Sequence, residues 1–413
     1  MDRLIFHVDV NSAFLSWEAA KRVREGLPDL RLIPSAIGGD RDKRTGIILA
    51  KSIPAKKSGV TTGEPVLSAL RKCPDLVLAK PDFILYKRCS DAFTAILREY
   101  APVVEKVSID ECYLDMTGTG LLYPDPIKIA YTIKDRIRDE LGFTVNVGIA
   151  RSRLCAKMAS DFEKPDRVHT LFPDEIPAKM WRLPIRDLLF VGDATATRLE
   201  RAGLSTIGRV AACDEDTIKS IIGEKNGKLI HDYSLGIDNS EVSDKPWEAK
   251  GYSVSTTVEK DITTRDEAER ILLALSDSVT SRMRADGVMC RCVAVSIRTY
   301  SFTNRSHQMK IDATDLTNEV YEVSKKLFGE LWDGRTPLRL LGIALTDLTR
   351  ERIVQLSLFH DNDAEEARER SRKLDRAVDE IRKKFGSSTI VLGIPPEREV
   401  GKKFKIEQDE RNK

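Results

Sequence analysis

The stretch VVEKVSIDECYLDM, residues 103–116, decides the fold of the N-terminal part of this chain. Val103 to Ile109 and Cys112 to Met116 are short runs rich in β-branched and apolar residues, and they flank a tight connection. Runs of this kind predict two paired strands. Asp110 and Glu111 occupy the connection, so two adjacent carboxylates are expected at one end of a hairpin.

A third strand is predicted nearer the N-terminus. Leu4 to Val10 is an apolar, β-favouring run, and Asp9 lies at its end. A helix capped by Asn11 or Ser12 follows and continues through Glu25. Asp9 is therefore expected where a buried strand passes into a helix.

The segment after this helix has a different character. Residues 28–78 contain short runs such as Gly46–Ala50, broken by glycine, proline and charged residues. Such short runs predict a small subdomain inserted between larger elements.

Helices and strands alternate after the insertion. Residues 82–100 predict a helix, and a second helix begins at Asp125-Pro126 and stops at Gly142. Residues 143–149 alternate like a half-buried strand, and residues 152–163 are helical. The predicted order is β-α, insertion, α-β-β-α-β-α-β, which is close to a ferredoxin-like sandwich with an insert.

The rest of the chain divides into regions of different composition. Residues 174–236 predict short helices, and the polar residues 237–249, which include Pro246, predict a linker. Mixed strands and helices follow to residue 347, with Val288 to Tyr300 as the clearest strand. The tail after Arg350 combines a short apolar motif, an acidic stretch and one helix over residues 364–385.

Bulk properties indicate a soluble, cytoplasmic protein. The 413 residues are 41% hydrophobic and 32% charged, with a net charge of +2, which neither demands nor excludes nucleic acid. Of seven cysteines only Cys290 and Cys292 lie close together, which favours reduced thiols over a disulfide or zinc framework. The first ten residues do not resemble a secretory signal, and no apolar run is long enough to predict a membrane span.

Three carboxylates are candidate metal ligands. In a ferredoxin-like sandwich the first strand and the hairpin can be neighbours, so Asp9, Asp110 and Glu111 can converge, and such hard oxygen ligands suit Mg²⁺. Adjacent residues of a regular strand face opposite ways, so Asp110 and Glu111 share a site only if the backbone turns there. The alternative is that all three are ordinary solvated carboxylates, and Asp115 is interpreted in that way, as a surface or turn residue.

Three motifs in this order resemble those of the Y-family, or translesion, DNA polymerases, most closely the bacterial DNA polymerase IV type. HVDVNSAF at residues 7–14 is similar to their opening motif, and VSIDECYLD at residues 107–115 is similar to their second metal motif. VGIA at residues 147–150, AKMAS at residues 156–160 and the Lys164-Pro165 pair are similar to their third. The resemblance covers about the first 350 residues.

The resemblance implies an α+β multidomain, right-hand polymerase. It predicts a ferredoxin-like palm at residues 1–11 and 79–168, small fingers at 12–78, and a helical thumb with a helix-hairpin-helix at 169–237. A linker at 238–249, an α/β little finger at 250–349 and a tail at 350–413 complete the expected domains.

The expected activity is that of a DNA-directed DNA polymerase for lesion bypass. It implies attack of a primer 3′-hydroxyl on a deoxynucleoside triphosphate paired to a template, with two Mg²⁺ ions, low fidelity and no proofreading. Primer–template DNA and deoxynucleoside triphosphates are the expected partners of a monomeric enzyme. A polymerase V-like subunit that needs accessory proteins is the alternative within the family.

The same resemblance assigns roles to individual residues. Asp9, Asp110 and Glu111 become the catalytic metal ligands, together with the backbone carbonyl of Val10. Phe14 matches the steric gate, an aromatic ring that excludes a 2′-hydroxyl, although a plain core aromatic, as Trp17 is expected to be, remains the alternative. Lys157 matches a lysine that contacts the triphosphate as a point charge.

The fingers depart from the family pattern. Ile53 stands where a tyrosine is usual and cannot donate a hydrogen bond. Lys56 replaces an arginine and loses the planar, two-pronged grip. Lys56 is the predicted nucleotide contact, with Lys51 or Lys57 as substitutes, and the alternative is a solvated lysine face.

A glycine pair in the insert suggests a rival function. Gly38-Gly39-Asp40 matches a short turn of palm-type nucleotide cyclases. The match covers only three residues and lies between short segments of the insert, so a simple glycine turn is the preferred interpretation. A second rival, an inactive DNA-bound scaffold, is disfavoured by the intact carboxylate set.

Two regions are candidates for holding DNA. Val191-Gly192-Asp193 opens a predicted helix-hairpin-helix, whose backbone N–H groups, at Gly192 above all, would bind a phosphate. Phe190 stands where a glycine is usual, and plain packing of two helices is the alternative.

The second candidate is the little finger, where basic residues cluster. On the strand Val288 to Tyr300, Ser296, Arg298 and Tyr300 are expected on the face opposite the apolar one. Arg291, Arg298 and Arg305 are the predicted DNA contacts, within a stretch that also contains Arg282, Arg284 and Lys310. A solvated sheet face is the alternative.

The tail carries a motif that resembles the bacterial clamp-binding peptide. Gln355, Leu356, Leu358 and Phe359 would bind a sliding clamp, with Leu358 and Phe359 as apolar anchors. Packing of the same residues onto the little finger is the alternative. The helix that follows could do likewise or cover the motif.

Overall fold

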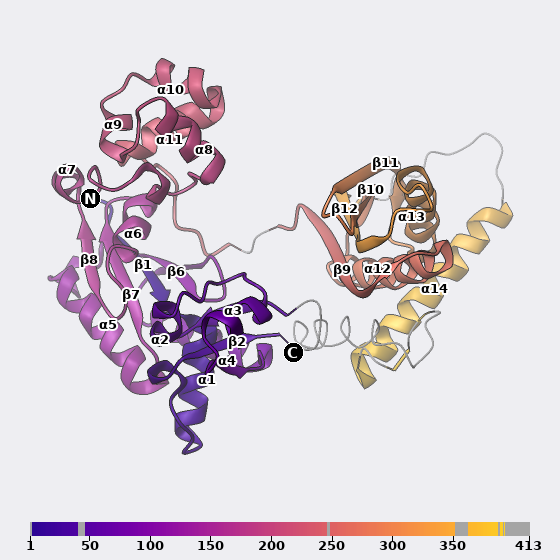
Figure 1. The fold of residues 1–413 in the computed structure, drawn as a ribbon, viewed down its shortest axis with the longest axis horizontal. Helices are drawn as coiled ribbons and strands as arrows, with labels where there is room; N and C mark the ends of the chain where they lie inside the picture. The colour runs from indigo at the N-terminus through magenta and orange to yellow at the C-terminus, as the bar shows by residue number, and fades with distance from the viewer. Residues whose placement is uncertain are drawn as a thin grey trace. The chain divides into compact units, whose positions relative to one another are not determined.

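The computed structural model describes residues 2–39, 46–245, 248–351, 362–386, 389, 390 and 392. They form two compact units, which divide after residue 246 and are described separately (Figure 1). Among these residues no helix combines the length and the apolar character that crossing a membrane requires.

A five-stranded sheet forms the centre of the first unit, in the order β5-β6-β1-β7-β8. The middle strand β1 is antiparallel to both neighbours, β6 and β7. The element order predicted for the sandwich is confirmed, including the insertion after the first helix. The strands are β1 (Ile5–Val10), β5 (Val103–Lys106), β6 (Glu111–Asp115), β7 (Val145–Ala150) and β8 (Val168–Leu171).

The two faces of this sheet have different partners. Phe6, Val8 and Val10 of β1 belong to a core with α4 (Phe83–Arg98) and α5 (Pro126–Leu141). The alternate residues Ile5, His7 and Asp9 point to the other face, which α6 (Arg153–Ser160) covers. Asp9 therefore points to the same side of the sheet as α6.

Two local predictions at these elements were wrong. β7 was expected to be half-buried, but all six residues are buried because helices pack on both faces. The helix α1 (Ala13–Arg24) begins where expected, but Ser12 provides no side-chain cap. Ser12 has a left-handed φ of 48°, and the neighbouring Ser16 hydroxyl donates to the Asn11 carbonyl at 2.5 Å.

The inserted segment forms a small subdomain with its own core. Its three-stranded sheet has the order β3-β2-β4. Helix α1 connects it to the palm, because Trp17 is buried in the palm core while Leu15 and Ala19 pack on the insert. The elements are η1 (Leu30–Leu32), β2 (Ser35–Gly38), β3 (Ile48–Lys51), α2 (Ile53–Lys57), α3 (Val66–Lys72) and β4 (Val77–Ala79).

Short helices follow β8, as predicted, and share a hydrophobic core with α6. They appear together in Figure 1 as the cluster α8–α11, with α7 beside the palm sheet. The elements are η2 (Thr119–Leu121) in the palm, then η3 (Pro173–Glu175), α7 (Ile176–Lys179), η4 (Ile185–Asp187), α8 (Asp193–Arg201), α9 (Ile207–Ala211), α10 (Glu215–Ile222) and α11 (Glu224–Ser234).

The second unit is a four-stranded antiparallel sheet in the order β11-β10-β12-β9, with helices packed on one face. Its core includes Leu272 and Leu275 of α12, Phe328 of α13, and Val293 and Val295 of β10. The elements are β9 (Gly251–Ile262), α12 (Arg265–Ala285), β10 (Met289–Thr299), β11 (Asn304–Thr314), α13 (Thr317–Leu331) and β12 (Leu338–Thr349).

The tail helix α14 (Asn362–Phe385) is bound to this unit largely by ion pairs. Arg284 of α12 pairs with Asp379 at 2.7 Å and Asp375 at 3.2 Å, and Arg382 pairs with Asp277 at 2.7 Å. Arg284 belongs to the predicted basic stretch, but its side chain is only 7% exposed and pairs with these two carboxylates. Part of the predicted basic cluster therefore holds the tail helix.

Candidate active site

One pocket of about 530 Å³ brings together most of the predicted catalytic residues. It lies within the first unit, where the palm sheet meets α1, β3 and α2, and its volume is that of an ordinary small-molecule site. Its lining includes Asp9, Val10, Phe14, Lys51, Ile53, Lys56, Asp110, Glu111, Lys157 and Lys164.

The strand register explains why the three carboxylates converge. Asp9 and Glu111 are direct partners across β1 and β6, so their side chains point to one face. Asp110 precedes β6, in a turn where the Val10 N–H donates to its carbonyl at 3.0 Å. The Ser108 hydroxyl donates to the Asp110 carboxylate at 2.6 Å. The backbone turn that allows the adjacent carboxylates of Asp110 and Glu111 to share one site is therefore present.

A glycine allows α6 to approach these carboxylates. A Cβ added to Gly148 of β7 would lie 2.0 Å from the Ala156 carbonyl oxygen and 2.5 Å from the Ser160 nitrogen. The backbone of α6 therefore packs directly on the sheet at this position. Lys157, one residue beyond Ala156, reaches the pocket as a result.

Two lysines neutralise the carboxylate group. Lys157 Nζ lies 2.6 Å from Glu111 Oε1 and 3.5 Å from Asp9 Oδ2. Lys164 Nζ donates to Asp9 Oδ2 and pairs with Asp161 at 2.8 Å. In the sequence Lys164 stands out only as part of the third motif, and no role is predicted for it. Its place beside proline at the end of the third motif was the signal that could have identified it.

The electrostatics suit a cation-binding site. Burial raises the pKa of the Asp9 carboxyl, although Lys164 and Lys157 act in the opposite direction. Burial lowers the pKa of Lys157, but Asp9, Glu111 and Asp161 outweigh it, so Lys157 is fully protonated at neutral pH. The clustered carboxylates offer an all-oxygen donor set in one pocket, and such a set fits Mg²⁺.

Phe14 is both a core residue and a pocket residue. Its ring stacks on Tyr86 at 4.7 Å and meets Phe83 edge-on at 6.1 Å. The same side chain lines the pocket beside Ala13 and Ser12. The steric-gate role stays a prediction, and the structure supplies the rigid backing that such a role requires.

The three fingers lysines are not equivalent. Lys51 and Lys56 line the pocket, whereas Lys57 does not. Burial and the nearby charge of Lys56 lower the pKa of Lys51, whose Nζ donates to the Thr62 hydroxyl at 3.0 Å. Ile53 also lines the pocket and is 53% exposed. Among the lysines that line the pocket, Lys56 is the one whose side chain has no hydrogen bond to another described residue, which favours it as the substrate contact.

The cyclase-like glycines lie away from this pocket. Gly38 ends β2 in the insert and Gly39 follows it, whereas the carboxylates lie on the palm sheet. Asp40 falls outside the described residues. The Gly39 N–H donates to Ile47, at 3.3 Å, which is consistent with a simple glycine turn.

The predicted helix-hairpin-helix has an unusual turn. Gly192 caps α8, and a Cβ added at Gly192 would meet nothing within 4 Å, so packing does not require a glycine at this position. Phe190, at the usual glycine position, has a left-handed φ of 67° and a side chain that is 69% exposed. The backbone geometry is therefore that of the glycine although the residue differs, and phosphate binding stays a prediction.

The little-finger arginines do not share one surface. Ser296 and Arg298 of β10 pair with Ser306 and Asn304 of β11 and face away from the helices. Arg305 pairs with the core residue Ile297 and so points to the helix-covered side.

Small and hydroxyl-bearing residues extend the open face across the rest of the sheet. Gly342 of β12 lies between Ser296 and Ser255, and a Cβ there would lie 2.6 Å from the Ser296 hydroxyl. Arg291 donates to the Thr349 hydroxyl at 3.4 Å.

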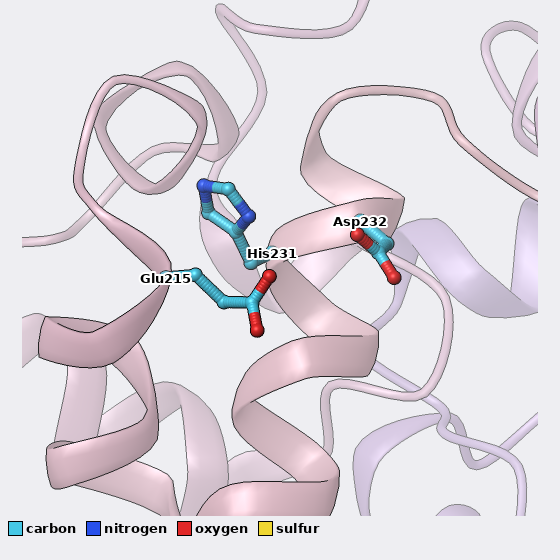
Figure 2. A group of neighbouring side chains, drawn as sticks. All are labelled: Glu215, His231 and Asp232. Atoms are coloured by element: carbon cyan, nitrogen blue, oxygen red, sulfur yellow. The ribbon is translucent and has the colours of Figure 1, made fainter.

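A second group of titratable residues lies in the short-helix region. Glu215, His231 and Asp232 have potential ligand atoms within 4.8 Å of one another (Figure 2). Lys219 lies 2.5 Å from Glu215, and Lys228 lies 3.2 Å from Asp232. Because Lys228 of α11 also lies 3.7 Å from Glu215 of α10, we interpret the group as an ion-pair cluster that joins the two helices.

The remaining predicted residues fall outside or apart from the pocket. Gln355, Leu356, Leu358 and Phe359 lie outside the described residues. All seven cysteines are free thiols in the structure.

Comparison with known proteins gives the family. Residues 8–161 match the impB/mucB/samB family, and residues 249–358 match the C-terminal domain of the same family. A solved Y-family DNA polymerase chimera of Dbh and Dpo4 has the same fold, with a TM-score of 0.73, 21% identity and coverage of 84% of this chain and 100% of the chimera.

Curated relatives match over almost their whole length. DNA polymerase IV of Clostridium acetobutylicum is 41% identical, over 97% of this chain and 100% of the relative. DNA polymerase IV of Acetivibrio thermocellus is 35% identical over 95% and 98%, and DNA polymerase IV 2 of Bacillus subtilis is 36% identical over 94% of each chain. The chain belongs to the impB/mucB/samB family and, within it, to the Y-family DNA polymerases of the DNA polymerase IV type.

Proposed function

We propose that this chain copies damaged templates as a low-fidelity, DNA-directed DNA polymerase that lacks proofreading. The observation that carries the proposal is the convergence of Asp9, Asp110 and Glu111 with Phe14 and the pocket lysines in one cavity. This combination offers ligands for cations, positive charge for a triphosphate and an aromatic ring for a sugar.

The carboxylates would hold two Mg²⁺ ions, with the backbone of Val10 in the same pocket. Bound there, the ions would activate the primer 3′-hydroxyl and stabilise the leaving pyrophosphate. Lys157 and Lys164 hold the carboxylates in place before substrate arrives and would then turn to phosphate oxygens. Phe14, which lines the same pocket, would press on the deoxyribose.

The open face of the second unit's sheet would carry the DNA backbone. Its serines, threonines and glycines let a phosphate chain approach closely, and Arg298 adds charge. Gly192 and Arg291 are further proposed contacts, and Arg305 would contribute from the other side of β11. Contacts of this kind carry no sequence information, which suits an enzyme that accepts any template.

Primer extension tests the proposal directly. The full chain, Mg²⁺, deoxynucleoside triphosphates and a primer–template are combined without other proteins, on undamaged and damaged templates. Extension past a lesion, with no removal of a mismatched primer end, is the expected result. A need for added subunits would favour the polymerase V-like alternative, and primer-independent cyclic nucleotide formation would favour a cyclase.

Lys56→Ala is expected to raise the KM for deoxynucleoside triphosphate about tenfold, because one charge-assisted phosphate contact is lost. Steady-state kinetics on one template gives the number. Lys57→Ala is the matched control, since Lys57 is adjacent in sequence but does not line the pocket. An unchanged KM for Lys56→Ala, with a raised KM for Lys51→Ala, would assign the contact to Lys51 instead.

We also propose that the protein is cytoplasmic and that its tail binds the sliding clamp. The proposed clamp-binding residues are Gln355, Leu356, Leu358 and Phe359. Leu358→Ala with Phe359→Ala is expected to leave synthesis without clamp unchanged and to abolish its stimulation by clamp, because a tether raises only the effective concentration at the primer end. Leu374→Ala is the control, since it removes another exposed apolar residue of the tail. If the double variant binds the clamp as tightly as the parent protein does, the motif has a structural role and does not bind the clamp.

A further inference from the structure

The first half of the predicted linker is fastened to the palm. Residues 236–243, here called the strap, run along the N-terminal end of α6. The Gly236 carbonyl accepts from Cys155 Sγ at 3.7 Å, and Asp238 accepts from the Leu154 N–H at 2.9 Å. Val242 is 92% buried, in the core that α6 shares with the short helices, so the strap is bound by apolar packing as well.

Glu105 and Arg153 close the far end of the strap. Glu105 of β5 is 4% exposed, and its two carboxylate oxygens have different partners. One accepts from Arg153 Nη2 at 2.9 Å, and the other accepts from the backbone N–H of Ser243 at 3.0 Å. Arg153 Nη1 also donates to the Glu241 carbonyl at 3.0 Å. A buried carboxylate fully used in this way fixes the main chain at Ser243.

The Glu105–Arg153 pair that holds Ser243, here called the clip, lies on the catalytic side of the palm. Glu105 is the strand partner of Tyr113, whose ring lies under the Arg153 guanidinium at 4.6 Å. Tyr113 is two residues beyond Glu111, so it shares a face with that carboxylate. Arg153 begins α6, which carries Lys157. The strap is therefore anchored to the same elements that build the pocket.

We propose that Glu105 and Arg153 are positioning residues that set where the tether to the second unit begins. With the clip closed, the connection to β9 extends from Ser243 to Gly251 rather than from Gly236. Releasing the strap would about double the length of this connection. Effective concentration falls roughly as the −3/2 power of tether length, so the second unit would be presented to DNA about threefold less effectively.

Hydrogen exchange tests the clip without any assay of activity. In Glu105→Gln, which keeps the side-chain shape, the amides of residues 238–245 are expected to exchange about tenfold faster or more. Glu99→Gln is the matched control, because Glu99 pairs with Arg136 at 2.6 Å elsewhere on the palm. Asp238→Ala releases the strap at its other end and leaves the buried Glu105 pair intact. Unchanged exchange in both strap variants overturns the clip.

Primer–template binding tests the positioning role and rests on the proposed polymerase function. The dissociation constant is expected to rise about threefold in Glu105→Gln, with kcat at saturating DNA unchanged. Faster amide exchange without weaker DNA binding overturns the positioning role. A fall of kcat by the same factor as the rise of the dissociation constant shows general damage to the enzyme instead. Failure of the parent protein to bind DNA would reject the proposed function, while the exchange result would still decide the clip.

Discussion

Asp110→Ala is expected to reduce nucleotide addition by about a thousandfold or more. A carboxylate that holds a cation contributes several kcal/mol to stabilisation of the transition state, and each 1.36 kcal/mol is a factor of ten in rate. Asp110 lies in a turn before β6 and contacts β1 through its backbone, while its carboxylate accepts from the Ser108 hydroxyl of the same turn, so its loss leaves the strand pairing intact. Single-turnover primer extension gives the rate, and a gel-shift assay checks that DNA binding is retained.

Asp115→Ala provides the matched control. Asp115 is the last residue of the same strand, and its carboxylate accepts from the Thr117 N–H at 2.9 Å, away from the pocket. We expect a near-parental rate for this variant. Asp9→Ala and Glu111→Ala are expected to behave like Asp110→Ala. A folded Asp110→Ala protein that extends primers at a near-parental rate would rule out the proposed site.

The palm was predictable because local signals there agree with tertiary structure. Each strand is a short apolar run, and α5 has an aspartate cap that accepts from two N–H groups and a left-handed terminal glycine. The convergence of Asp9 with Glu111 follows from neighbouring strands once their order is known. No residue preference in the sequence predicts the backbone turn at Asp110. The turn was expected only on the condition that Asp110 and Glu111 share one metal site.

Side-chain partners distant in sequence could not be predicted. Arg284 was predicted only as one member of a basic stretch, because its partners Asp375 and Asp379 are 91 and 95 positions away. Arg305 looked equivalent to Arg298 until the register of β10 and β11 placed the two on opposite faces. A shift of one residue in register reverses every side chain of a strand. Composition alone therefore predicted a basic region but not which face carries its charge.

The strap shows the same limit for backbone. Residues 238–243 are polar except for Val242 and precede a proline, which is typical of a linker. Their attachment depends on Glu105, a residue that reads as an ordinary strand carboxylate 138 positions earlier. Polar composition indicates that a segment can lie free in solvent. Whether it does depends on hydrogen bonds to buried partners elsewhere in the chain. Lys164 illustrates the converse, since a sequence motif contained it and only the geometry gave it a role.

Phe14→Ala is expected to admit ribonucleotides. The ring lines the pocket, and in the proposed steric-gate role its removal leaves space for a 2′-hydroxyl. Discrimination by the shape of a pocket is worth about ten- to two-hundredfold for one small group, so the ratio of deoxyribonucleotide to ribonucleotide incorporation efficiency should fall by about that factor. Competition kinetics with matched nucleotides measures the ratio for both proteins.

Phe83→Ala separates this effect from lost packing. Phe83 meets Phe14 edge-on and belongs to the same aromatic group as Tyr86, but it does not line the pocket. Removing either ring costs core packing, and the thermal midpoints of both variants should fall together. Only Phe14→Ala should also lose sugar discrimination. An equal loss of discrimination in Phe83→Ala would mean that the pocket wall depends on the whole aromatic group, and an unchanged ratio in Phe14→Ala would make Phe14 a core residue alone.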